Sequence, residues 1–242
     1  DTFISHLVEL RDRLLRAVVA IAVAFVCLMP WAGEIYDILA HPMMQALPEG
    51  TRMIATGVVT PFFVPMKVTL LVAFVVALPF VLYQAWCFIA PGLYAHEKRL
   101  GLPLVIGSTI LFLAGMAFCY FFVFGTVFKF IAQFAPKSIT PAPDIEQYLA
   151  FVMSMFLAFG ITFEVPVFVI VLVKLGVVDV PKLKEARPYV IVGAFIVAAV
   201  VTPPDVVSQL MLAIPMCLLY ELGIFLARFV TKTRADAVAE ES

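Results

Sequence analysis

Charged residues are scarce in this sequence, and the motifs of several enzyme classes are missing. Only 14% of the 242 residues are Asp, Glu, Lys or Arg, against about 25% in soluble domains, whereas 64% are hydrophobic. No G-x-x-x-x-G-K phosphate loop and no H-E-x-x-H metal motif occurs. The three histidines lie outside the apolar runs, and the four cysteines match no zinc or redox spacing. We therefore predict a polytopic membrane protein that is not an enzyme, with no cofactor, metal or nucleic-acid partner.

Six apolar runs predict an all-α fold, a single membrane domain over residues 1–242 with six transmembrane helices. The fifth run holds only 13 apolar residues, about 20 Å of helix against a hydrocarbon core of about 30 Å. Such a span is matched by thinner bilayer or by other subunits. We therefore expect a locally thinned membrane beside spans five and six, where partner helices dock. The predicted spans are about 15–31, 61–89, 100–130, 145–173, 189–201 and 206–227.

The segments outside these spans have distinct patterns. Apolar residues at helical spacing over residues 1–14 predict an amphipathic helix that lies on the membrane surface and runs into the first span. Residues 32–61 predict an ordered outer cap, with a short helix broken by Pro42. The Asp144-x-x-Gln147 spacing predicts a capping box at the start of span four. Residues 230–242 are rich in charge and predict a disordered tail.

Orientation follows from the cations. Twelve of the 16 Lys and Arg residues lie near the amino terminus, in the turn around residues 90–100, in the 174–188 segment and in the tail. Cytoplasmic segments of membrane proteins carry such an excess. Both termini are therefore expected on the cytoplasmic side of the membrane.

Two acidic residues of the expected cytoplasmic side, Glu9 and Glu97, are candidate binding groups. Glu9 could simply pair with Arg13 four residues on, and Glu97 could simply favour the dipole at a helix start. Both carboxylates, however, stand among cations at one membrane surface. Each could accept a bidentate fork, so a pair of them suits a ligand with two guanidinium groups.

Glu164 is a third candidate, because a charge inside a membrane span is costly and is often functional. One interpretation is a protonated carboxyl that bonds the carbonyl of Thr162, which Pro166 leaves without its helical partner. Another is a polar contact for a substrate or a partner helix. A proton-coupled solute transporter with Glu164 as its proton-binding group is the rival function. Discontinuous helices at matching positions of two halves would favour this transporter hypothesis, and no such repeat is visible. A purely structural scaffold is the third possibility.

Five motifs, in order and at matching spacings, resemble the TatC family, the multispan receptor of the twin-arginine protein translocase. The similarity covers almost the whole chain and shows no departure at the motif residues. The motifs are His6-Leu-Val-Glu-Leu-Arg11, Phe88-Ile-Ala-Pro-Gly-Leu-Tyr94 with His96-Glu97-Lys-Arg99, Phe163-Glu-Val-Pro166, Arg187-Pro-Tyr-Val190 and Thr202-Pro-Pro-Asp205.

The resemblance implies a concave, glove-like bundle that binds signal peptides with paired arginines and helps folded proteins cross the membrane. It implies TatA- and TatB-type single-span partners in a multimeric receptor complex, driven by the proton motive force. The resemblance assigns signal-peptide binding to Glu9 and Glu97, with Arg11, Leu93 and Tyr94 nearby. The resemblance also implies a membrane-embedded polar contact at Glu164, and docking of partner helices around Gln209.

Overall fold

The computed structural model describes residues 3–47, 52–89, 98–134, 136, 142–202 and 204–240, with side chains for 4–47, 52–89, 101–134, 136, 142–202 and 204–229. Helices make up nearly all of these residues, as predicted, and the β contact within them is one isolated bridge. In chain order the helices are α1 Phe3–Leu28, the 3-10 turn η1 Met29–Trp31, α2 Ala32–Ala46, α3 Thr60–Ile89, α5 Lys98–Phe118, the π-helix η2 Cys119–Val123, α6 Phe124–Phe134, α7 Ile145–Phe163, α8 Val165–Lys174, α9 Val180–Glu185, α10 Arg187–Val201 and α11 Val206–Glu240.

Five helical stretches of the described residues are long and apolar enough to cross a membrane. α10 is equally apolar but has 15 residues, about 22 Å of helix against a core of about 30 Å. Five long apolar helices and a short one confirm the polytopic fold and the short fifth span. The five stretches are Ile4–Ala46, Thr60–Ile89, Gly101–Phe134, Ile145–Lys174 and Val206–Phe229.

The amino-terminal segment is helical, as predicted, and runs into the first span. Residues 3–14 are the first turns of α1, which continues unbroken to Leu28. The physical reason is that α1 contains neither glycine nor proline, so nothing interrupts its hydrogen-bond ladder. Glu9 therefore stands on the same rigid helix as the first span.

The predicted break at Pro42 is wrong, because α2 continues through this residue to Ala46. A proline in a helix leaves the carbonyl four residues earlier without its usual N–H donor. Here that carbonyl belongs to Ile38, and the hydroxyl of Tyr120 donates to it at 2.9 Å. The adjacent carbonyl of Leu39 accepts from the hydroxyl of Tyr148, also at 2.9 Å. Side chains outside α2 thus stabilise the turn that proline weakens.

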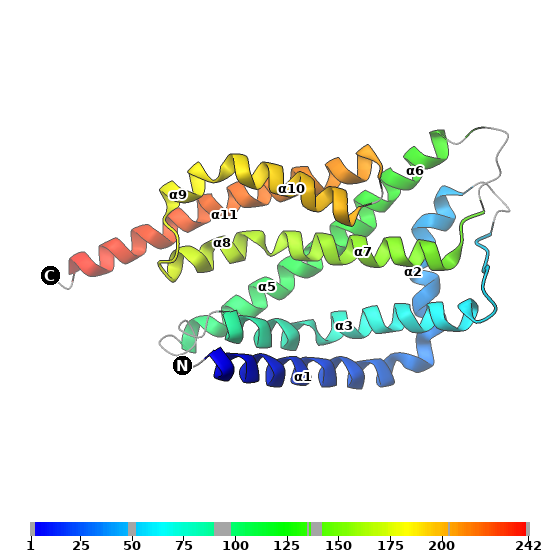
Figure 1. Cartoon of the computed structure of the whole chain (residues 1–242), viewed down its shortest axis with the longest axis horizontal. Helices are drawn as coiled ribbons and strands as arrows, with labels where there is room; N and C mark the ends of the chain where they lie inside the picture. Colours follow the sequence, from blue (N-terminus) through cyan, green and yellow to red (C-terminus); the bar gives the residue numbers. More distant parts are fainter. Residues whose placement is uncertain are drawn as a thin grey trace. The chain divides into compact units, whose positions relative to one another are not determined.

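Contacts divide the chain into two compact units, Asp1–Ile89 with Ala117–Phe156, and Ala90–Met116 with Leu157–Ser242. In the first unit α1 and α3 pack side by side (Figure 1). The ring of His6 stacks on that of Phe88 with centroids 4.4 Å apart, whereas Arg13 reaches Gln84. The helices are therefore antiparallel, and the start of α1 lies beside the end of α3.

The described part of the outer cap is ordered, as predicted. Ile54 forms a parallel bridge with Asp144: its N–H donates to the Pro143 carbonyl at 3.0 Å, and its carbonyl accepts from the N–H of Ile145 at 2.9 Å. Asp144 Oδ1 accepts from the backbone N–H groups of Glu146 at 2.9 Å and Gln147 at 3.2 Å, which makes Asp144 the N-cap of α7. The cap is thus fastened to the start of the fourth span.

The third predicted span contains an irregularity with no sequence signal that we recognise. Between α5 and α6 the chain forms the π-helix η2, in which each turn takes up an extra residue. Tyr120, which donates to the Ile38 carbonyl, lies in this segment. Beyond η2, the rings of Phe124 and Phe128 pack against α7, each with Phe151 as one partner.

In the second unit α8, α9 and α10 all contact α11. Their buried core consists of Val169, Val173, Leu183, Tyr220, Ile224 and Ala227. The Tyr220 hydroxyl donates to the carbonyl of Leu183 at 2.7 Å, which fastens α9 to α11. α11 continues to Glu240, so the structure differs from the disordered tail expected over residues 230–242. Alanine and glutamate, both good helix formers, account for the extension.

Candidate functional site

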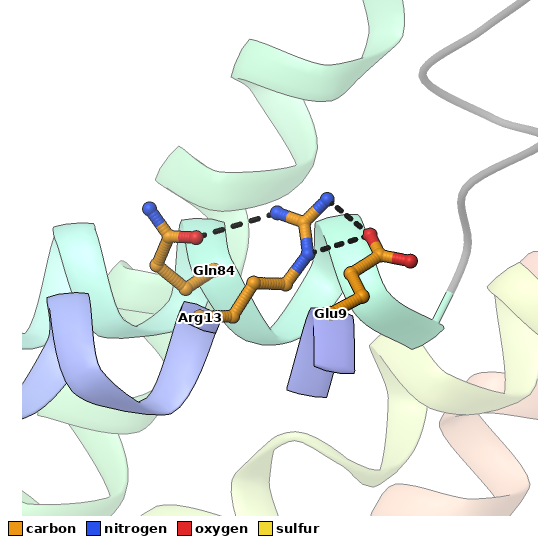
Figure 2. A network of polar contacts seen from close by, with 3 residues as sticks. All are labelled: Glu9, Arg13 and Gln84. Carbon is orange, nitrogen blue, oxygen red and sulfur yellow. Dashed lines mark hydrogen bonds and ion pairs between the residues drawn. The ribbon is translucent and has the colours of Figure 1, made fainter. Parts of the chain in front are cut away.

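The first candidate site is a network between the start of α1 and the end of α3 (Figure 2). Arg13 donates from Nε and Nη2 to the same oxygen of Glu9, Oε1, at 2.8 and 2.6 Å. Its third nitrogen, Nη1, donates to Oε1 of Gln84 at 3.3 Å. The expected pair of Glu9 and Arg13 therefore forms. Gln84, which the sequence marks only as a polar residue in an apolar span, completes it.

Exposure differs sharply within this network. The Gln84 residue is 5% exposed, the Arg13 side chain 23% and the Glu9 side chain 42%. The network thus runs from a buried amide to a solvent-facing carboxylate. The second oxygen of Glu9, Oε2, points away from the guanidinium in Figure 2. Within the part of the chain that the structure describes, it accepts no hydrogen bond.

Arg11 does not join Glu9. Two residues apart on a helix, their side chains face in nearly opposite directions. Arg11 is largely exposed and forms an ion pair with Asp12 at 2.8 Å. The other residues assigned to this site, Glu97, Leu93 and Tyr94, lie outside the described residues.

The second candidate site is Glu164, at the break between α7 and α8. The break shows in the backbone, because the N–H of Glu164 bonds the carbonyl of Ile161, three residues earlier, at 3.0 Å. Its side chain accepts a hydrogen bond at Oε2 from the Ser108 hydroxyl of α5 at 2.6 Å. The hydrogen-bond partner of Glu164 is thus Ser108 and not the Thr162 carbonyl. Oε1 of Glu164 is buried and has no hydrogen-bond partner among the described residues.

Two glycines bring α5 and α7 close enough for this contact. A Cβ on Gly115 of α5 would stand 2.5 Å from the carbonyl oxygen of Phe159 on α7. A Cβ on Gly160 of α7 would collide with the Phe112 ring of α5. Small residues allow close helix approach in membranes. Sequence reasoning missed Ser108 as the partner of Glu164, because the close approach joins residues far apart in the chain.

The third candidate region is the pair α10 and α11. Gln209 donates from Nε2 to the carbonyl of Phe195 on α10 at 3.4 Å, near the limit of a hydrogen bond. Near the other end of α10, Arg187 pairs with Glu221 through two contacts of 2.7 Å. Glu221, which interrupts the apolar run of span six, therefore has a partner within the unit. Pro203, in the predicted turn between the spans, lies outside the described residues.

Metal-ligand chemistry has little support in the described side chains. Among them, no three His, Cys, Asp or Glu residues gather in a group that could hold a metal ion. The polar groups that do gather are a carboxylate held by a guanidinium and a carboxyl beside a hydroxyl. Such groups can bind cations and hydrogen-bond donors. Fold and sites together define a multi-pass helical membrane protein with one half-exposed and one embedded carboxyl site.

Comparison with known proteins identifies the family. The family model of the Sec-independent protein translocase protein (TatC) matches residues 5–215. The chain is 52% identical to TatC of Halothiobacillus neapolitanus, over 99% of this chain and 67% of that protein. It is 50% identical to TatC of Escherichia coli K12, over 93% of this chain and 88% of that protein. The chain therefore belongs to the TatC family of protein-transport membrane proteins.

A solved structure agrees with the sequence relatives. The crystal structure of the twin-arginine translocase receptor TatC superposes with a TM-score of 0.82 at 40% sequence identity. The match covers 93% of this chain and 99% of that chain. The family resemblance that the five motifs indicated is confirmed.

Proposed function

We propose that this protein is the receptor of a twin-arginine translocase, which binds Arg-Arg signal peptides of folded proteins at the cytoplasmic face of a bacterial inner membrane. The observation that carries the proposal is Glu9. Its carboxylate is held on a rigid helix, is 42% exposed, and keeps one oxygen for a further donor. A guanidinium is the donor that best fits a carboxylate.

The second guanidinium of the signal peptide is assigned to Glu97. This residue immediately precedes α5 in the sequence and is followed by two cations, Lys98 and Arg99. Leu93 and Tyr94 are proposed as its apolar and aromatic neighbours in the binding surface, and Arg11 as a flanking cation. Two carboxylates matched to two guanidinium groups explain why a paired motif is read.

The embedded groups are assigned to partner helices. Glu164 keeps a buried oxygen without a donor, so a polar residue of a TatA- or TatB-type single-span subunit can supply one. Gln209, whose side-chain hydrogen bond to the Phe195 carbonyl is long at 3.4 Å, is proposed as a second contact, beside the short helix α10. In this proposal the proton motive force drives transport in a multimeric complex.

The proposal is tested by peptide affinity with the full chain in lipid nanodiscs. Labelled peptides carrying Arg-Arg or Lys-Lys are titrated against Glu9→Gln, Glu97→Gln and a control, Glu146→Gln. Glu146 suits as the control because it is a paired, similarly exposed carboxylate whose partner is Lys67. Loss of a charged hydrogen bond costs about 1.5–3 kcal/mol. Both site variants should therefore bind Arg-Arg peptide at least about tenfold more weakly.

Glu97→Gln should have the larger effect, because we expect a carboxylate at a helix terminus to be held rigidly. Equal Arg-Arg affinity in the wild-type protein and in both site variants would show that the carboxylates are not the binding groups. A Lys-Lys peptide that binds as tightly as Arg-Arg would contradict a twin-arginine receptor.

A proton-coupled transporter remains the second candidate, because Glu164 is a carboxyl with one buried oxygen that has no partner. Protein export by two variants, Glu164→Gln and Glu164→Ala, distinguishes the two proposed functions. If Glu164 acts by hydrogen bonding, Glu164→Gln keeps much of the protein export that Glu164→Ala loses. If Gln is as inactive as Ala, a protonatable group is required, and the transporter gains support.

A further inference from the structure

Arg13 is a guanidinium fixed inside the site that is proposed to receive another guanidinium. Its three nitrogen atoms are all used, two on Glu9 and one on Gln84. Both bonds to the carboxylate go to Oε1, so the bidentate fork that a carboxylate usually offers is half occupied. An incoming arginine meets Oε2 alone, at an angle that Arg13 sets.

Gln84 is what keeps Arg13 in place. It is a buried amide on α3, and burial limits the positions open to its side chain. Arg13 is itself mostly buried, with the stacked rings of His6 and Phe88 marking the same antiparallel contact of α1 and α3. An arginine whose three nitrogen atoms all donate, to acceptors on two helices, and which is largely enclosed is a fixed part of the site.

The charge of Arg13 has a second effect. The Glu9–Arg13 pair carries no net charge, so a cation that relies on charge alone gains little from it. A lysine ammonium is such a cation, a compact and strongly hydrated point charge. A guanidinium is less hydrated and donates along fixed directions, so it still gains from one well-aimed carboxylate oxygen.

We infer that Arg13, anchored by Gln84, is a positioning residue that makes the Glu9 site discriminate arginine from lysine. The inference rests on the proposed binding of twin-arginine peptides at Glu9. Arg13 lowers the site's general attraction for cations and aims Oε2, so that geometry decides which cation binds. The opposite role would be a resident competitor that leaves Glu9 when the peptide arrives.

The test measures the affinity ratio of Arg-Arg to Lys-Lys peptide for the full chain in nanodiscs. Arg13→Gln removes both charge and anchor, Arg13→Lys keeps the charge without the fork, and Gln84→Leu removes the acceptor with little change in volume. Arg16→Gln is the matched charge control, an exposed arginine on the same helix. Thermal unfolding of each variant establishes that it is folded, and Arg13→Lys remains usable if the neutral variants unfold.

The expected result is a fall in the ratio of about tenfold in Arg13→Gln, Arg13→Lys and Gln84→Leu. Arg13→Gln should achieve it mainly through tighter Lys-Lys binding, and the other two through weaker Arg-Arg binding. Arg16→Gln should leave the ratio unchanged. Because Gln84 acts only through Arg13 on Glu9, Gln84→Leu should have no further effect in a Glu9→Gln background.

Three results overturn the inference. Tighter Arg-Arg binding in Arg13→Gln at an unchanged ratio identifies a competitor. No change in either affinity identifies a structural ion pair. An effect of Gln84→Leu that persists without Glu9 shows that Gln84 acts elsewhere. Failure of the proposed function is distinct, because there Glu9→Gln itself leaves Arg-Arg affinity unchanged.

Discussion

Replacing Gly115 by alanine should force α5 and α7 apart and disturb Glu164. The new Cβ would lie 2.5 Å from the carbonyl oxygen of Phe159, 2.9 Å from its carbonyl carbon and 3.0 Å from the ring of Phe163. The two nearest atoms are backbone, so no flexible side chain can give way. One helix must therefore move by several tenths of an ångström or more to restore van der Waals contact.

The cost follows from overpacking, typically about 1–3 kcal/mol for an inserted methyl or methylene group in a close-packed site. Gly107 on the same helix provides the control, because a Cβ there meets nothing within 4 Å. Gly107→Ala should be neutral or stabilising by up to about 1 kcal/mol, since alanine favours helix over glycine. The difference between the two variants isolates the close approach from helix propensity.

Thermal or denaturant unfolding in detergent measures both variants, and protein export measures their function. Gly115→Ala should unfold more easily than Gly107→Ala and should export less. The Ser108 hydroxyl, two turns away on α5, is only 2.6 Å from Glu164, so a displaced helix lengthens that bond. Equal stability and equal export in the two glycine variants would show that the close approach of α5 and α7 at Gly115 does not hold Glu164 in position.

Three further predictions concern other parts of the fold. A hydrogen bond from the Thr56 side chain, and weaker ones from backbone N–H groups, lower the pKa of Asp144 in the folded protein. The charged carboxylate therefore stabilises the fold at pH values above the unfolded pKa of 3.8, and this stabilisation is lost as the pH falls through the lower folded pKa. The stability gap between wild type and Asp144→Asn should narrow in that acidic range. Tyr120→Phe should destabilise by about 1–3 kcal/mol in unfolding experiments, because the Ile38 carbonyl loses its donor. Inserting four apolar residues after Ile196 lengthens α10 by about one turn and should impair protein export. Normal export by this variant would show that the short length of α10 is not needed for function.

The helices were largely predictable because each apolar run is long and uninterrupted. The second predicted span, 61–89, differs from α3 by a single residue at its start. The N-cap at Asp144 also followed from local sequence, since its bonds join neighbours in the chain. Such features depend on residues a few positions apart.

The departures from prediction have the opposite origin. Pro42 ends a helix in isolation, and it stays inside α2 only because a hydroxyl 82 residues away in sequence supplies a donor. Ser108 and Glu164 are likewise brought together by a glycine contact that no local pattern reveals. The charged pair could be predicted only in part. The spacing of Glu9 and Arg13 predicted their contact, but it did not predict that Gln84 would restrain the arginine.

The bond from Tyr120 to the turn at Pro42 makes two distant positions chemically dependent on each other. A relative without proline at position 42 regains a backbone donor for the Ile38 carbonyl, and its residue 120 is then released from carrying a hydroxyl. A relative that keeps the proline but loses the hydroxyl has an unsatisfied carbonyl. The two positions should therefore change together during evolution, in the order that replaces proline before tyrosine.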